Sequence, residues 1–465
     1  MSRRRERGGV PVGFWVATLG ARGAGVTKEL LLASLLGTAP WKDALVAAWT
    51  APALIASYSS ETLPALLTPL WVQSGTARGG RRLVLGALAL LGLLSCAAMI
   101  WPQATIAAIA PGLAGPGRAE AIALERWLGA AVVVLGAQAL LTARLNALRR
   151  FAWGPLAAGL PALGAVVWLL ASGGEALPAR MLGLAAALVA GGVLGVLMLA
   201  LVAWRTRAPA APAPGRGLDA AAGPDVAPWR GLDAAPWRAL GAVLAATLLL
   251  NLVPLAERIA CSGLSAGSLA AYDYGERLVQ LVFTASVAPF TVVSFTGLSA
   301  VAGRAALPRQ LEQSLRGLLT LVMPLAVMLA VFAPLVVGCV YGRGRFHAAS
   351  LRATAPVVAI KGGGLGLDAA FYLLLFGLYA GGRASAKLPA AAVLAAVNIP
   401  LALAGAARWG LAGVAWAHVA AYAAGLAVLA HASWGWRGLH WRPALRAAAL
   451  AGGLTLAAAL AVRAA

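Results

Sequence analysis

Long apolar runs alternate with short polar connections along the whole chain. In order, the runs predict about thirteen membrane-crossing helices, at residues 12–37, 42–74, 82–111, 119–147, 152–172, 180–204, 237–260, 269–302, 315–341, 350–380, 388–406, 410–433 and 445–463. A helix of about 20 apolar residues crosses about 30 Å of hydrocarbon. The pattern therefore predicts an all-α polytopic membrane protein, with two six-helix lobes and one additional C-terminal helix.

Composition supports a membrane protein and explains its strong positive charge. Of 465 residues, 61% are hydrophobic and 11% are charged, which is too little charge to cover a soluble protein of this size. A net charge of +22 in a soluble protein would suggest nucleic acid binding. Here one alternating set of connections holds 23 Lys and Arg residues and the opposite set holds nine. This asymmetry predicts a cytoplasmic N-terminus, an outward turn at residues 261–267, and no nucleic acid partner.

The longest polar connection divides the chain into two parts. It is rich in Ala, Pro and Gly, and the motifs RGLDAA and APWR each occur twice within residues 205–238. Such a composition is typical of a flexible linker, here on the cytoplasmic side. The predicted domains are an N-terminal lobe at 1–204, a linker at 205–236, a C-terminal lobe at 237–433 and an additional helix at 434–465.

Patterns of catalytic and metal-binding residues are missing from the sequence. Cys96, Cys261 and Cys339 are scattered, and the four histidines have no ligand spacing. Hydrolase and metalloprotease motifs do not occur in any connection long enough to form an active site. We therefore expect a protein that is not an enzyme and that has no cofactor and no metal site.

Charged side chains inside the apolar runs are the candidate functional residues. Each costs about 2.5–3.5 kcal/mol at the middle of a span, so it normally faces a partner or a wet cavity. The first half contributes Arg22, Lys28, Glu29, Asp43 and Glu61, and the second half contributes Glu257, Arg258, Glu276, Arg277, Lys361 and Asp368. Three deep cations, Arg22, Lys28 and Arg277, suit an anionic substrate, because guanidinium groups pair with phosphate through two hydrogen bonds.

Two acid–base doublets, Glu257-Arg258 and Glu276-Arg277, flank the turn at residues 261–267. Their distances from the turn place them at similar depth on neighbouring antiparallel helices, so a cross-helix pair such as Glu257 with Arg277 is geometrically reasonable. Internal ion pairs that fix helix register, or side chains that snorkel to the membrane interface, are the alternatives to a functional role. The segment KGGGLGLDAAF, residues 361–371, matches no phosphate-binding loop, and its small residues predict a helix kink or close packing.

Several stretches resemble the MurJ/MviN family, the lipid II flippases of the multidrug/oligosaccharidyl-lipid/polysaccharide exporter superfamily. The segment ERIACSGLSAGSLAAYDYGERLVQL is similar to the family's seventh and eighth helices, where a YADRLVQLP-like run follows a turn. VYGRGRFHAASLRAT resembles the pattern LFxRGxFxxxxxxxT, and LLLFGLYAGGRASAKLP resembles RxFYAxxDTRTP. At the N-terminus, GARGAGVTKELLLASLLGTAPWKDALVAAW is similar to SRxLGFxRDxxxAxxFGxxxxxDAFxxAF. The similarity follows the chain in order over most of its length.

This resemblance implies a function and a set of site residues. It implies a multi-pass flippase of the bacterial inner membrane, which moves an undecaprenyl-pyrophosphate-linked peptidoglycan precursor outward by alternating access. Arg22, Lys28 and Arg277 match family cations that bind the diphosphate. Asp43, Glu257 and Glu276 would orient these cations or bind a coupling ion, with Na+, H+ or the membrane potential as the source of free energy. Membrane lipids and enzymes of cell-wall synthesis are the implied partners.

The sequence also departs from the family pattern. Ala56 stands where the family has another cavity arginine, the region of Gly382 lacks the acid of the DTRTP motif, and one helix fewer is predicted than the family usually has. Three alternatives therefore remain open. They are an exporter of another polysaccharide unit, a drug/cation antiporter of the same superfamily, and a non-transporting scaffold for cell-envelope synthesis.

Overall fold

The computed structural model describes residues 12–57, 78–148, 150–206, 236–301, 306–433 and 440–464. Helices make up nearly all of these residues, and no strand occurs among them. Most of the predicted linker at 205–236, and Glu61 with the end of the second predicted span, lie outside the described residues. Chain contacts divide the molecule into two compact units, with 1–36, 40–109 and 113–211 in the first unit and 37–39, 110–112 and 212–465 in the second.

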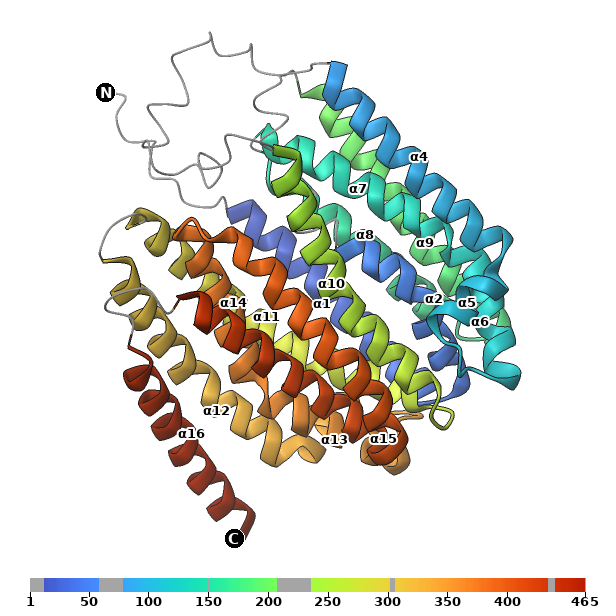
Figure 1. Ribbon diagram of the computed structural model, residues 1–465. Helices are drawn as coiled ribbons and strands as arrows, with labels where there is room; N and C mark the ends of the chain where they lie inside the picture. The colour runs from blue at the N-terminus through green and yellow to red at the C-terminus, as the bar shows by residue number, and fades with distance from the viewer. Residues whose placement is uncertain are drawn as a thin grey trace. The chain divides into compact units, whose positions relative to one another are not determined.

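Eight helices form the described part of the first unit. They are α1 (Val12–Leu36), α2 (Pro40–Ser57), α4 (Arg78–Ile100), α5 (Pro102–Ile109), α6 (Gly115–Leu128), α7 (Ala130–Ala147), α8 (Trp153–Ala171) and α9 (Leu177–Arg205). Helix α8 packs on α1 and α9, and α2 packs on α6 (Figure 1). Small residues allow this close approach: a side chain at Gly191 of α9 would overlap the backbone of α8 at Leu160.

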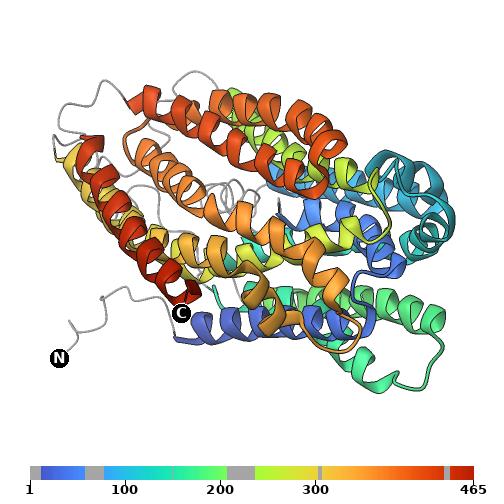
Figure 2. The same cartoon turned by 90° about the horizontal axis from the view of Figure 1, so that it is seen from below.

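The second unit contains seven α-helices among the described residues. They are α10 (Pro236–Ser262), α11 (Ser268–Ala300), α12 (Leu307–Tyr341), α13 (Ala348–Gly363), α14 (Leu365–Ala380), α15 (Lys387–Ser433) and α16 (Trp441–Ala464), with a short 3-10 turn at Ala384–Ala386. Helix α10 packs on α15, α11 packs on α13 and α14, and α16 lies along α12 (Figures 1 and 2).

Helix α15 is a hairpin of two arms. Gly410 has φ of 58° and ψ of −139°, values that break the helix and that glycine adopts without steric cost. Gly405 and Gly413 are eight residues apart, which would separate them by about 12 Å in a straight helix. Instead a Cβ at Gly405 would lie 2.7 Å from the carbonyl oxygen of Gly413, so the chain must reverse between them. The two predicted spans at 388–406 and 410–433 correspond to these arms.

The predicted all-α membrane fold is confirmed, while the predicted number of spans is approximate. Six helices of the described residues are long and apolar enough to cross a membrane, or up to nine if each bent pair counts as one span. The hairpin α15 is counted as one of these six helices although it has two arms. One bent pair, α13 with α14, turns by 43° at Gly364, as the glycine-rich segment 361–371 predicts. Large apolar side chains such as Leu194, Leu335 and Leu454 are more than half exposed, as expected of a surface that faces lipid.

Candidate functional site

Glu257 lies at the centre of a buried polar cluster in the second unit. Its side chain is 1% exposed, and partners from three other helices surround it. The hydroxyl of Tyr272 donates to Oε2 at 2.7 Å, and the amide Nδ2 of Asn398 donates to Oε1 at 3.0 Å. Lys361 Nζ lies 3.3 Å from Oε2, and His418 Nδ1 lies 2.9 Å from Oε1. A carboxylate so deep in an apolar unit requires this many partners, because an isolated buried charge costs several kcal/mol.

Lys361 joins Glu257 to a second acid. Its Nζ lies 3.2 Å from Oε1 of Glu276 and 3.3 Å from the hydroxyl of Tyr272, and it is 4.9 Å from the centre of the Tyr272 ring. Glu276 also lies 4.0 Å from the guanidinium of Arg258, across the α10–α11 turn. The ammonium thus fills the space between two carboxylates that a free cation would otherwise occupy.

His418 connects Glu257 to a third acid. Its Nε2 lies 3.6 Å from Oδ2 of Asp368, and its ring stacks on Tyr422 with centroids 4.6 Å apart. Both ring nitrogens therefore face carboxylate oxygens. The remaining oxygen of Asp368, Oδ1, is buried and has no hydrogen-bond partner in the part of the chain that the structure describes. We call Glu257, Arg258, Tyr272, Glu276, Lys361, Asp368, Asn398 and His418 the Glu257 cluster.

Two backbone features bring the Glu257 cluster together. The hairpin of α15 carries Asn398 on one arm and His418 on the other, so that both reach Oε1 of Glu257. The bend at Gly364 separates Lys361, in the last turn of α13, from Asp368, in the first turn of α14. Without the reversal at Gly410, Asn398 and His418 would be about 30 Å apart along a helix.

The predicted residues of the second unit divide between this cluster and a separate pair. Glu257, Glu276 and Arg258 belong to the cluster, and a cross-helix pair does form, between Arg258 and Glu276. The expected pair of Glu257 with Arg277 is wrong, because Glu257 is engaged by Lys361 and His418 instead. Arg277 bonds the buried carboxylate of Asp273, one turn earlier on α11, with Nε to Oδ2 at 2.7 Å, and its side chain remains 32% exposed.

The first unit has its own charged group. Lys28 Nζ lies 2.9 Å from Oε1 of Glu29, and Lys42 Nζ lies 2.9 Å from its Oε2. Asp43 is buried beside Lys42 in the first turn of α2, whereas Arg22 is exposed on α1. Lys42 is the first residue of the predicted span 42–74, and the structure buries it: its side chain is 1% exposed.

Five residues of these groups are not among the candidates that the sequence predicts: Lys42, Tyr272, Asp273, Asn398 and His418. Asp273 precedes Arg277 by four residues, and that helical spacing was a readable signal. Asn398 and His418 are polar residues inside apolar runs, which is a signal of the same kind as a charge but weaker. Lys42 stands at the end of a predicted span, where a charge is less costly, so its position gives no comparable signal. No group of three His, Cys, Asp or Glu residues suited to a metal ion occurs in the described part of the chain.

Glu125 of α6 is a buried acid that is not paired with a described cation in the way that Glu257 and Glu29 are. Glu125 is 0% exposed, and neither of its carboxylate oxygens has a hydrogen-bond partner among the described residues. Because an apolar side chain of similar length removes the desolvation cost, Glu125→Met is expected to stabilise the protein by about 1–3 kcal/mol. Thermal unfolding of the detergent-solubilised protein, followed by size-exclusion chromatography, measures this change. An exposed acid such as Glu175 supplies the matched control, Glu175→Met, which should leave the midpoint unchanged; a lower midpoint for Glu125→Met would contradict the argument.

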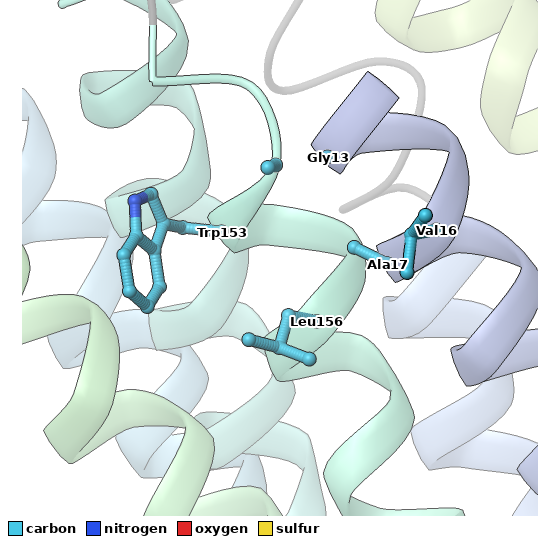
Figure 3. Close-up of a pocket in the computed structure, with 6 residues that line it drawn as sticks. Gly13, Val16, Ala17, Trp153 and Leu156 are labelled. Atoms are coloured by element: carbon cyan, nitrogen blue, oxygen red, sulfur yellow. The ribbon is translucent and has the colours of Figure 1, made fainter. Parts of the chain in front are cut away.

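The first unit also has an apolar hollow between α1 and α8, of about 410 Å³, lined by Gly13, Val16, Ala17, Ala152, Trp153 and Leu156. Figure 3 shows Val16 and Ala17 on one helix and Trp153 and Leu156 on the other. The described residues that line it include no charged side chain.

Known proteins resemble this chain in sequence and in structure. The family model described as Lipid II flippase MurJ matches residues 32–434. No curated protein shows significant sequence similarity to the chain. A solved structure of "Lipid II flippase MurJ, inward closed conformation" has a TM-score of 0.81 at 15% identity, covering 97% of this chain and 93% of that one.

Transporters from a wider superfamily also share the fold. An inward-facing multidrug resistance MATE family transporter of the MOP superfamily has a TM-score of 0.63 at 14% identity, covering 92% of this chain and 95% of that one. A MOP superfamily transporter from Pyrococcus furiosus has a TM-score of 0.54 at 14% identity, covering 94% and 95%. At these identities the structural similarity establishes the fold alone.

Proposed function

Because the chain belongs to the MurJ family of lipid II flippases, we propose that it moves lipid II, or a related undecaprenyl-pyrophosphate-linked glycan, across the bacterial inner membrane. Members of this family are multi-pass membrane transporters and not enzymes. The observation that carries the proposal is the family match, which extends over residues 32–434 and so includes most of both units. Transport from the cytoplasmic to the periplasmic leaflet would proceed by alternating access of the two lobes.

In this proposal Arg22, Lys28 and Arg277 bind the pyrophosphate. Two features of the described residues support them: Arg22 is exposed, and the side chain of Arg277 is 32% exposed although it lies within α11. Asp273 holds the Nε of Arg277, which fixes the direction of the guanidinium. A fixed guanidinium can form two parallel hydrogen bonds with phosphate oxygens. The proposal gives Asp43, Glu257 and Glu276 the role of orienting cations or taking part in coupling.

The arginine asymmetry of the connections supports a cytoplasmic N-terminus. Peptidoglycan synthesis needs its precursor on the outer side, so the proposed role lies in cell-wall biogenesis and cell shape. The drug/cation antiporter is the weaker alternative, because Glu257 and Glu276 are paired with Lys361 and Arg258 and are not free to bind a cationic drug. The Arg277→Ala experiment distinguishes a flippase from the scaffold alternative.

Arg277→Ala tests the proposal directly. Loss of a charge-assisted hydrogen bond costs about 1.5–3 kcal/mol, so flipping of lipid II in proteoliposomes should fall about 10- to 100-fold. Arg277→Lys should lose less, because it keeps the charge but not the paired hydrogen bonds. The matched control is Arg343→Ala, at an exposed position of the same unit, with wild-type flipping expected. A scaffold would tolerate Arg277→Ala, and cells that depend on the variant would then accumulate no lipid-linked precursor in the cytoplasmic leaflet.

A further inference from the structure

His418 lies where a neutral imidazole cannot satisfy its surroundings. A neutral ring carries one N–H and one lone pair. Both nitrogens of His418 face carboxylate oxygens, Nδ1 toward Glu257 and Nε2 toward Asp368. In the neutral form one of these nitrogens would direct its lone pair at a carboxylate. Only the doubly protonated ring offers an N–H to both acids.

The balance of charges in the Glu257 cluster also indicates that His418 is protonated. Three carboxylates, from Glu257, Glu276 and Asp368, face two permanent cations, Lys361 and Arg258. One negative charge is therefore left over in a buried site, and a proton on His418 balances it. Among the described residues, the elements packed on α15 contribute no further charge to this site: α10, α13 and α14 supply the charged residues already counted, and α15 itself supplies the uncharged Asn398 and Tyr422.

We propose that His418 binds a proton that is taken up and released during transport. Glu257 holds the imidazole ring in place, and Asp368 accepts the proton when it is released. This inference rests on the proposed flippase function and adds its coupling chemistry. Nδ1 stays bonded to Glu257 at 2.9 Å, which fixes the ring. The 3.6 Å separation between Nε2 and Asp368 Oδ2 exceeds a hydrogen bond, so this is the more loosely held proton.

Release follows from that geometry in two steps. Once Nε2 and Oδ2 of Asp368 approach to hydrogen-bond distance, the Nε2–H bond breaks and the proton binds Oδ2, which leaves a neutral imidazole and a neutral carboxylic acid. Asp368 then passes the proton to water on one side of the membrane and is again a carboxylate. Oδ1 of Asp368 has no hydrogen-bond partner among the described residues, so the acid has an oxygen free to take part in this transfer.

The same cluster disfavours a metal cation as the coupling ion. Lys361 Nζ already lies between Glu257, Glu276 and the hydroxyl of Tyr272, at 3.2–3.3 Å from each. A sodium ion bound to these oxygens would meet a fixed positive charge at contact distance, and electrostatic repulsion would oppose its binding. A proton on His418 lies beside Oε1 of Glu257, not beside Oε2, which Lys361 contacts, so it is not in direct contact with the ammonium and is repelled less.

The test uses the full chain in liposomes of phosphatidylethanolamine and phosphatidylglycerol, with fluorescent lipid II as the probe. Valinomycin and equal K+ clamp the membrane potential while a pH gradient is imposed. If one proton moves per lipid, the leaflet distribution of the probe should shift about tenfold for each unit of pH difference. His418→Gln and His418→Arg, which fix the neutral and the charged state, should show no shift. His431→Gln, at an exposed position on the same arm of α15, should shift as the wild type does.

Each result has a separate meaning. A wild-type shift that persists in His418→Gln, or one that follows a Na+ gradient and not the pH gradient, would overturn the assignment of His418. If the wild type moves no lipid II under any gradient, it is the proposed function that fails. If the wild type moves no lipid II, or if the variants do not fold, proton exchange at His418 is tested by nitrogen-15 NMR of the four histidines in lipid nanodiscs. The His418 resonance should change between protonation states from about pH 5 to about pH 9, and an invariant resonance would refute proton exchange.

Discussion

Lys361→Met is expected to destabilise the protein by about 3–5 kcal/mol, which is the usual cost of removing one partner of a buried ion pair. The ammonium contacts Glu257 and Glu276 at 3.3 and 3.2 Å, and its side chain is only 3% exposed. Methionine fills the same volume, so the loss of charge and not a cavity causes the effect. Thermal unfolding of the detergent-solubilised protein, followed by size-exclusion chromatography, should show a large fall in midpoint.

A double variant separates the ion pair from other effects. Glu257→Gln keeps an oxygen that can accept from Tyr272 but removes the negative charge. Lys361→Met combined with Glu257→Gln should therefore be more stable than Lys361→Met alone, and the difference gives the coupling between the two side chains. If the double variant loses the sum of both single losses, the ion pair does not stabilise the unit.

Gly413→Ala is the second change with a large expected effect. A Cβ at this position would overlap the backbone carbonyl of Gly405 on the opposite arm of α15. Backbone cannot move aside as a flexible side chain can, so the arms must separate, at a cost of about 1–3 kcal/mol or more. Because the arms carry Asn398 and His418, their separation should also weaken the Glu257 cluster. We therefore expect a lower thermal midpoint together with a lower rate of lipid II flipping.

Gly453→Ala is the matched control for this change. Gly453 lies in α16, and a Cβ there would meet nothing within 4 Å. Alanine is favoured over glycine inside a helix by about 1 kcal/mol, so the midpoint should hold or rise and flipping should be unchanged. Equal losses in the two variants would show that the glycine contact between the arms is unimportant.

The sequence predicted the helices well because each span is a local property. Apolar length and arginine asymmetry depend only on neighbouring residues, and the hairpin arms of α15 and the bend at Gly364 are both marked by glycines in the sequence. Packing between helices is a different matter. Which face of α13 or α15 meets α10 depends on how every helix is rotated, and hydropathy contains no such information in a chain that is apolar on nearly all faces.

The candidate site shows the same limit. Glu257 and Glu276 were singled out because charges in apolar runs are costly, whereas their partners were not identified. Lys361 is 104 residues from Glu257 along the chain and His418 is 161 residues away. Residues so far apart meet only after several helices have packed. The local pair of Asp273 with Arg277 could have been found by spacing, but the long-range contacts could not.

The shared contacts of the Glu257 cluster also restrict which substitutions its residues can accept during evolution. A lineage that loses Lys361 alone keeps two acids facing an apolar interior, so surviving descendants should exchange these positions jointly. Leu450 and Leu454 of α16 are under no comparable restraint, since both are more than 60% exposed and any apolar residue serves there. Orthologues should therefore vary freely along that helix while the interior acids and bases are inherited as a set.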